Sequence, residues 1–445
     1  MDSARDPFRR ALARVLRPFS RVEPGEVALV GVMTLTAFLL LTAYYLLKTV
    51  REPLILLQGG AEVKLYARAG QAVIMVAFVH FYGELARRVG RTKLLLIVFT
   101  FFISNLAVFA LLARTTLSIG LAFFLWVGVF SYTVVAQFWG LAADLCNEEQ
   151  GKRLFPIIGG GSSIGAVVGS RIAKSLVPYG AHVLMATAVA ILIACAALIF
   201  WAGQRPLAVP GKAAARVEQP LSTEGAFQLL IRDKYLVLIA ALVILLNWVN
   251  SSGEYLLDRT LLVAAHEQST RGVPAEVYVG AFKADYFAWY NSIGLALQLF
   301  AVSRIIRVVG VQNALFFLPA FAVVAYASAA FMPVLAVMRL VKIGENSLQY
   351  SLQETTRHAL FLRASRVEKF VGKTAVDTVF VRLGAIASAL TVYFGTRAGW
   401  SLGTFATIDA GLALVWMAVV VAIAKEHGRR GGHPESAPLA SPAPG

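Results

Sequence analysis

The stretch EVALVGVMTLTAFLLLTAYYLL at residues 26–47 decides the class of fold. It is almost entirely apolar, and Glu26 at its first position is its only charged residue. A hydrocarbon core about 30 Å thick needs about 20 apolar residues for each helical crossing, and this stretch supplies them. The run has full spanning length and lacks a small-residue cleavage site, so it is not a removable signal peptide. We therefore predict a transmembrane helix here.

Comparable apolar runs recur along the rest of the chain. Hydrophobic residues make up 58% of the sequence, charged residues make up 15%, and the mean hydropathy is +0.69. This composition is typical of a polytopic, all-α membrane protein rather than of a soluble domain. We predict about twelve spans, at residues 26–47, 64–84, 94–113, 118–143, 155–177, 181–203, 236–257, 284–303, 311–331, 333–356, 374–396 and 403–424.

The spans form two sets of six. Residues 26–203 and 236–424 are expected as six-helix halves, joined by a Pro-containing cytoplasmic linker at 204–235. A basic N-terminus at 1–25 and a disordered tail at 425–445 flank them. The halves look like weak repeats, because RRVGRTK at 87–93 corresponds to RVVGVQN at 307–313, an offset of 220, and the Gly-Lys pairs at 151–152 and 372–373 are 221 apart.

The distribution of Lys and Arg predicts the orientation. The N-terminus and the loops near 90, 152, 305 and 366 are basic, whereas the turns near 180 and 332 have no basic residue. The positive-inside rule therefore predicts that both termini are cytoplasmic, in the inner (plasma) membrane. Lys48, Arg51, Lys64 and Arg68 are expected in the first loop, where they break this rule.

Several function classes lack support in the sequence. The net charge of +16 follows topology rather than one soluble face, so anionic lipid is the expected partner and nucleic acid is not. Cys146 and Cys195 have no metal-ligand spacing, and GGGSSIG at 159–165 lacks the Lys that a phosphate loop requires. Gly161, Gly165 and Gly169 instead have the spacing of a close helix contact. We expect no cofactor, no enzymatic activity and no obligate protein partner.

Two six-helix halves in parallel repeat resemble the major facilitator superfamily, whose loop signature is similar to GELARRVGRTK at 83–93. Arg87 stands where that signature has an acid. The resemblance implies that spans 1, 4, 7 and 10 line a central cavity. Each of these spans carries polar residues three or four positions apart, and ionisable residues at membrane depth require a wet cavity or a partner.

Four segments further resemble the ATP/ADP translocase family of plastids and intracellular bacteria. They are KTVREPL at 48–54, FWGLAADLCNEEQGKRLFP at 138–156, the acid at Glu254, and GKTAVDTVFVRLG at 372–384. Gln150 occupies the position of the family's principal Glu. The resemblance implies paired acids and bases around an anion-binding cavity.

Two groups of candidate residues follow from the polar stripes and this resemblance. Substrate-binding candidates are Lys48, Arg51, Arg339, Lys342, Glu345, Asn346, Gln349, Asn250 and Glu254. Gating or charge-pair candidates are Glu52, Glu148, Glu149, Lys152, Arg153, Asp258, Lys373, Asp377 and Arg382.

The leading hypothesis is a secondary active transporter that moves a nucleotide, similar to ATP or ADP, or a related organic anion by alternating access. The alternative is a major facilitator superfamily carrier, linked to protons, for another small metabolite or a drug. A third class, a membrane-bound enzyme or lipid scramblase, would need a catalytic constellation at the interface, and the sequence offers none.

Overall fold

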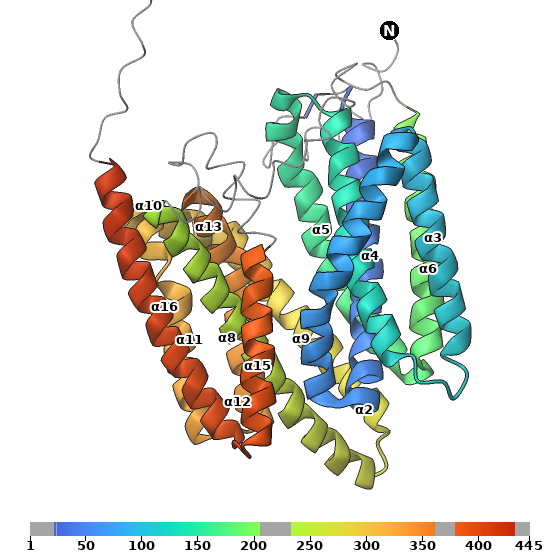
Figure 1. Cartoon of the computed structure of the whole chain (residues 1–445). Helices are drawn as coiled ribbons and strands as arrows, with labels where there is room; N and C mark the ends of the chain where they lie inside the picture. Colours follow the sequence, from blue (N-terminus) through green and yellow to red (C-terminus); the bar gives the residue numbers. More distant parts are fainter. Residues whose placement is uncertain (1–21, 24, 205–232, 361–378, 432–445) are drawn as a thin grey trace, which may run out of the picture. The chain divides into compact units, whose positions relative to one another are not determined.

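The computed structural model describes residues 22–23, 25–204, 233–360 and 379–431, and every regular element in these ranges is helical (Figure 1). This confirms the all-α fold class. Within the same ranges, seven helices are long and apolar enough to cross a membrane. The count of twelve stays a prediction. The chain forms two compact units, which are treated one at a time below.

The first unit covers residues 1–219, 254–295 and 334–343. α8 (Lys234–Thr270) contributes its second part from Glu254 onward, and α12 (Leu335–Leu348) contributes its residues up to Ile343. The other helices of this unit are α2 (Val27–Arg88), α3 (Arg91–Leu112), α4 (Gly120–Leu145), α5 (Glu148–Leu176), η1 (Val177–Tyr179), α6 (Ala181–Gly203) and α9 (Ala275–Ala296).

α2 consists of two helices in succession, because Gly60 interrupts it with a φ of +81°. Glycine adopts this left-handed conformation without the steric cost that a Cβ imposes. The first helix therefore runs through Pro53 to Gly59, well past the end expected at residue 47. The expectation that Lys48 and Arg51 lie in a loop was wrong, and the apparent exception to the positive-inside rule concerns residues inside helices.

Capping explains why α5 begins earlier than expected, at Glu148 instead of residue 155. The Asn147 side chain accepts a hydrogen bond from the Gln150 backbone at 2.8 Å, and the Gln150 side chain accepts one from the Asn147 backbone at 3.0 Å. This reciprocal capping box satisfies two backbone donors at the start of the helix. The motif EEQGKRLFP therefore belongs to α5 and not to the loop before it.

The three glycines of α5 pack against α2, as their spacing predicted. A Cβ on Gly161 or Gly169 would lie 2.7 Å from backbone atoms of residues 34 and 42 respectively, and one on Gly165 would lie closer still to the carbonyl of residue 38. The hydroxyl of Thr42 also donates to the Gly165 carbonyl at 3.2 Å. Only residues without a side chain allow two helix backbones to approach this closely.

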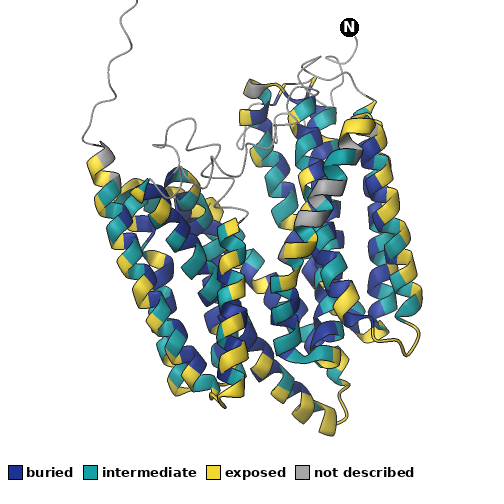
Figure 2. Cartoon of the chain, viewed as in Figure 1, coloured by how far each residue is buried: buried dark blue, intermediate teal, exposed yellow. Residues whose placement is uncertain are grey.

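An aromatic group fills the core of the first unit. The ring of Trp126 on α4 stacks on Phe123 and Phe130, with centroid distances of 5.8 and 5.5 Å, and Phe102 and Phe109 of α3 approach it from the side. Many large apolar residues of this unit are exposed, Leu111 among them, and Figure 2 shows exposed positions along its helices. Exposed apolar side chains in such number are typical of helices that meet lipid.

The second unit covers residues 220–253, 296–333 and 344–445. α11 packs along α16, and Trp248 of α8 donates to the Thr391 hydroxyl of α15 at 3.1 Å. Besides the remaining parts of α8 and α12, its elements are η2 (Leu297–Ala301), α10 (Val302–Ala314), α11 (Phe317–Phe331), η3 (Gln349–Gln353), α13 (Glu354–Leu360), α15 (Val381–Arg397) and α16 (Leu402–Gly431).

The corresponding glycines of the two sequence repeats mark comparable places in the two units. Gly90 is the N-cap of α3 and separates it from α2. Gly310, with a φ of +79°, interrupts α10 and separates two helical segments. The weak repeat therefore coincides with a helix boundary at both positions.

Candidate functional site

Five charged side chains form a buried cluster in the first unit, here called the ion-pair cluster. Lys64 lies 2.5 Å from Glu52 and 2.7 Å from Asp258, and Lys283 lies 2.6 Å from Asp258. Lys283 is also 3.7 Å from both Glu52 and Glu254. The sequence predicted Glu52, Glu254 and Asp258, and the structure brings these three acids together.

The local fold explains how these residues meet. The break at Gly60 turns α2 back on itself, so Glu52 and Lys64 face each other although they are twelve positions apart. Glu254 and Asp258 are one helical turn apart on α8 and share a face. Lys283 comes from α9 and is completely buried.

The cluster nearly balances its own charge. Three carboxylates face two lysines, and Arg51 pairs with Glu52 at 3.1 Å. A charged residue at the centre of a membrane helix costs about 2.5–3.5 kcal/mol on insertion scales, and nearby opposite charges offset part of that cost. The balance stabilises these groups together, whereas the loss of one member would leave a buried charge without its partner.

Lys48 lies among aromatic rings. Its ammonium lies 4.6 Å from the ring centroid of Phe287, 5.0 Å from that of Tyr45 and 5.4 Å from that of Tyr290. It also donates to the Tyr290 hydroxyl at 2.7 Å. Among the residues that the structure describes, no carboxylate forms an ion pair with this ammonium, and cation–π contacts hold it. Its role as a substrate ligand stays a prediction.

A tyrosine links Lys48 to the ion-pair cluster. Tyr286 donates to Glu254 at 2.6 Å, and its ring packs against that of Tyr290 with a centroid distance of 5.2 Å. Tyr290 is the residue that accepts the hydrogen bond from Lys48. A continuous series of contacts therefore runs from Glu254 on α8 through the two tyrosines of α9 to Lys48 on α2.

Arg339 is engaged elsewhere in the same unit, in a second group of charges. It pairs with Asp285 of α9, which also lies 2.8 Å from Lys174 and 3.4 Å from Arg171, both on α5. Asp285 was not predicted. Three basic residues around one acid leave this site with an excess of positive charge.

Lys342 is fully buried on α12 and acts electrostatically on Glu254 within the first unit. Its role as a substrate ligand stays a prediction. Arg339 and Lys342 are three residues apart on one helix, but Arg339 is one-third exposed and pairs with Asp285.

In the second unit, the structure brings together the four remaining substrate candidates. The Asn250 amide on α8 donates to Gln349 at 2.8 Å, to Asn346 at 2.9 Å and to Glu345 at 3.3 Å. The hydroxyl of Tyr326 on α11 donates to the other oxygen of Glu345 at 2.6 Å. The polar stripe that begins on α12 thus meets the polar face of α8. Their role as substrate ligands stays a prediction.

Most of the predicted gating residues lie away from these clusters or outside the described residues. At the start of α5, Glu149 and Lys152 are exposed, and the side chain of Glu148 is among those not described. Lys373 and Asp377 fall outside the described ranges, and Arg382 is half-buried on α15. Their gating role stays a prediction.

Arg153 has a defined partner at the entry of α2. It donates to both oxygens of Glu26 at 3.0 and 3.2 Å, and Gln150 donates to the same carboxylate at 3.0 Å. Burial alone raises the pKa of Glu26, but the Glu23 backbone amide, Gln150 and Arg153 together lower it below its usual value of 4.5. Gln150, at the family's Glu position, thus joins α5 to the start of α2.

A family model described as "TLC ATP/ADP transporter" matches residues 7–116. The matched region includes Lys48, Arg51, Glu52 and Lys64, which form the α2 side of the site. The resemblance to ATP/ADP transporters is confirmed.

Curated relatives agree with this match. The chain is 22% identical to ADP,ATP carrier protein 1 of Chlamydia trachomatis over 57% of this chain and 54% of that protein, and 22% identical to the Chlamydia muridarum protein of the same name over the same shares. The matched part of the chain spans about half the length of these relatives. The matches are to carriers and not to enzymes.

Solved structures share the fold of this chain. A mutant of the nucleoside transporter NupG aligns with a TM-score of 0.63 and 13% identity over 90% of this chain and 99% of that chain. The POT family transporter PepTSo aligns with a TM-score of 0.63 and 11% identity, over 90% of this chain and 98% of that one. Together with the apolar helices, this establishes a multi-pass membrane protein.

Sequence reasoning missed Lys283 because the eighth span was expected to begin at residue 284, and it did not single out Asp285 within that span. α9 begins at Ala275, so both residues lie well inside a helix. A charged residue in an apolar helix is a functional candidate by default, and a longer window would have found Lys283. Lys64 was noted only as a loop residue.

Proposed function

We propose that this chain is a secondary active transporter that moves a nucleotide, similar to ATP or ADP, or a related organic anion by alternating access. The single observation that carries the proposal is Lys48, a cation caged by aromatic rings with Arg51 one helical turn away. Phosphate oxygens suit an ammonium and a guanidinium, and the guanidinium can bind two oxygens at once. The relatives named as ADP,ATP carriers support the nucleotide class.

The ion-pair cluster supports the transport part of this proposal. Glu52 and Lys64 come from the first six-helix half of the sequence, whereas Glu254, Asp258 and Lys283 come from the second. A carrier that alternates between two states needs contacts that form in one state and open in the other, and charges that exchange partners supply them. We propose this gating role for Glu52 and Asp258, with the protein in the inner membrane and both termini cytoplasmic.

The test is nucleotide exchange in proteoliposomes loaded with ADP, measured as uptake of labelled ATP. Lys48→Gln should lower the initial rate at least tenfold, because removal of a charged hydrogen bond costs about 1.5–3 kcal/mol. Lys93→Gln is the matched control, since Lys93 is exposed, and it should leave the rate unchanged. Equal exchange by both variants would overturn the role of Lys48. Uptake of neutral metabolites but not of nucleotides by the wild-type protein would favour the proton-linked alternative.

A further inference from the structure

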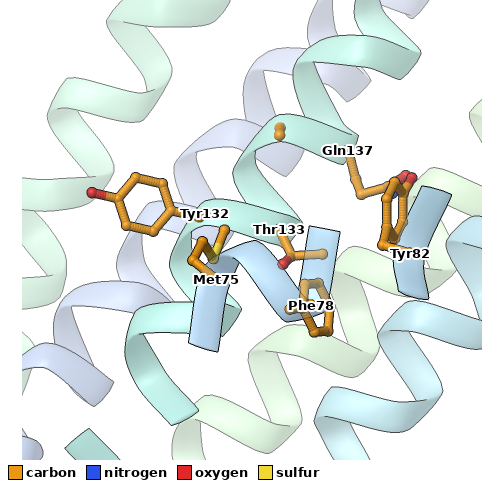
Figure 3. Close-up of a pocket in the computed structure, with 7 residues that line it drawn as sticks. Met75, Phe78, Tyr82, Tyr132, Thr133 and Gln137 are labelled. Atoms are coloured by element: carbon orange, nitrogen blue, oxygen red, sulfur yellow. The ribbon is translucent and has the colours of Figure 1, made fainter. Parts of the chain in front are cut away.

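A cavity of about 330 Å³ lies in the first unit between α4 and the part of α2 that follows Gly60 (Figure 3). None of the predicted site residues lines it. Its volume is at the lower end of the range typical of small-molecule sites. The lining residues are Met75, Phe78, Tyr82, Tyr132, Thr133, Ala136 and Gln137.

The walls of this cavity are flat and aromatic, with one polar edge. Phe78 and Tyr82 stack nearly parallel, at an interplanar angle of 17°. Gln137, only 6% exposed, extends from α4 towards α2 and donates to the Tyr82 hydroxyl (Figure 3). The Thr133 hydroxyl donates to the Val129 carbonyl at 2.8 Å, so its hydrogen is committed to its own helix.

A tyrosine relates the cavity to the aromatic surroundings of Lys48. Tyr132, one of the lining residues, acts electrostatically on Tyr44 of α2. The Tyr44 ring centroid is 5.9 Å from the Lys48 ammonium. A nucleotide has a flat base at one end and anionic phosphates at the other, which are the two chemistries that the cavity and Lys48 offer.

We infer that this cavity receives the planar base of the transported nucleotide, while Lys48 and Arg51 hold its phosphates. The inference rests on the proposed function and adds the part of the site that selects the base. Aromatic side chains stack on nucleobases with about 1–3 kcal/mol per base. The Gln137 amide carries a donor and an acceptor, the pair that reads the edge of adenine.

The experiment compares binding of ATP, UTP and inorganic tripolyphosphate to purified protein in detergent, by competition against a labelled nucleotide. Gln137→Leu should reduce the preference for ATP over UTP about tenfold, the discrimination that a bidentate amide contact provides. Tripolyphosphate lacks a base, so its affinity should not change. Tyr132→Leu should weaken both nucleotides but not tripolyphosphate. Tyr179→Leu, on another exposed tyrosine, is the matched control and should change none of the three.

The two proposals fail in different ways. If wild-type protein binds no nucleotide, the nucleotide part of the proposed function is wrong, and the inference falls with it. If wild-type protein binds nucleotides but Gln137→Leu and Tyr132→Leu leave every affinity unchanged, or weaken all three ligands equally, only the base pocket is wrong.

Discussion

The ammonium of Lys283 lies 2.6 Å from a carboxylate oxygen of Asp258, and neither side chain has appreciable exposed surface. Asp258 was predicted from the sequence as a charge-pair candidate, whereas Lys283 was not. Loss of either partner would leave a buried charge without its closest counter-charge, which costs about 3–5 kcal/mol.

Lys283→Met should therefore destabilise the protein by about 3–5 kcal/mol, as measured by the thermal unfolding midpoint in detergent. The double variant Lys283→Met with Asp258→Asn should recover part of the loss, because no unpaired charge from this pair then remains. Arg259→Gln tests an exposed pair with Glu62, at 3.0 Å, and should cost less than about 1 kcal/mol. Equal effects of Lys283→Met and Arg259→Gln would contradict the assignment.

Tyr290→Phe removes the hydroxyl that accepts a hydrogen bond from Lys48. The ring and its cation–π contact remain. The change removes the hydrogen bond from Lys48, worth about 1.5–3 kcal/mol, and a longer contact of 3.2 Å with the Tyr45 hydroxyl. We expect the apparent affinity for the transported nucleotide to change at least tenfold, with little change in the unfolding midpoint. Tyr179→Phe is the control. A drop in stability without a change in affinity would reduce Tyr290 to a packing role.

Gly165→Ala should disrupt the packing of α5 on α2. Its new Cβ would overlap the Phe38 carbonyl oxygen, so one helix must shift, and forced overpacking costs about 1–3 kcal/mol. Gly160→Ala, in the same glycine run but with nothing within 4 Å of the new Cβ, should be neutral or slightly stabilising. The unfolding midpoints of the two variants give the comparison, and equal midpoints would refute the close contact.

The carboxylate of Glu26 should make stability depend on acid pH. Because its pKa is lowered in the folded state, its contribution is fully present above about 4.5, its usual value, and is lost as the pH falls through the lower, folded value. Wild-type protein should thus be more stable than Glu26→Gln at pH 7, by about 1 kcal/mol, and the difference should vanish at strongly acid pH. The measurement is the unfolding midpoint of both proteins from pH 7 downward. A difference that grows on acidification would contradict the sign.

The sequence predicted the helices better than their ends. Apolar length identified α6 at residues 181–203 without error, because Gly180 precedes this charge-free run and Gln204 follows it. It failed where a helix continues through charged residues, as in α2 beyond Leu47 and α9 before Ala284. Charged residues were interpreted as the end of a span, but the burial of those charges depends on partners from distant parts of the sequence.

The sequence predicted only part of the site, because contacts between residues far apart in the chain cannot be inferred from local spacing. Helical spacing gave Asn250 a polar face on one span and Glu345, Asn346 and Gln349 a polar face on another. The hydrogen bonds show that these two faces meet, which the spacing alone did not specify. The meeting of Lys64 with Asp258, by contrast, joins residues 194 positions apart, and no local pattern encodes that pairing.

The break at Gly60 also has a consequence for biosynthesis. Because Glu52 and Lys64 lie on either side of it, they can neutralise each other as soon as the first hairpin has left the ribosome, long before α8 and α9 exist. The hairpin can then enter the bilayer with these two charges already paired, and Asp258 and Lys283 are added to a pair that is in place. The ion pairs can therefore form in the same order in which the chain is synthesised.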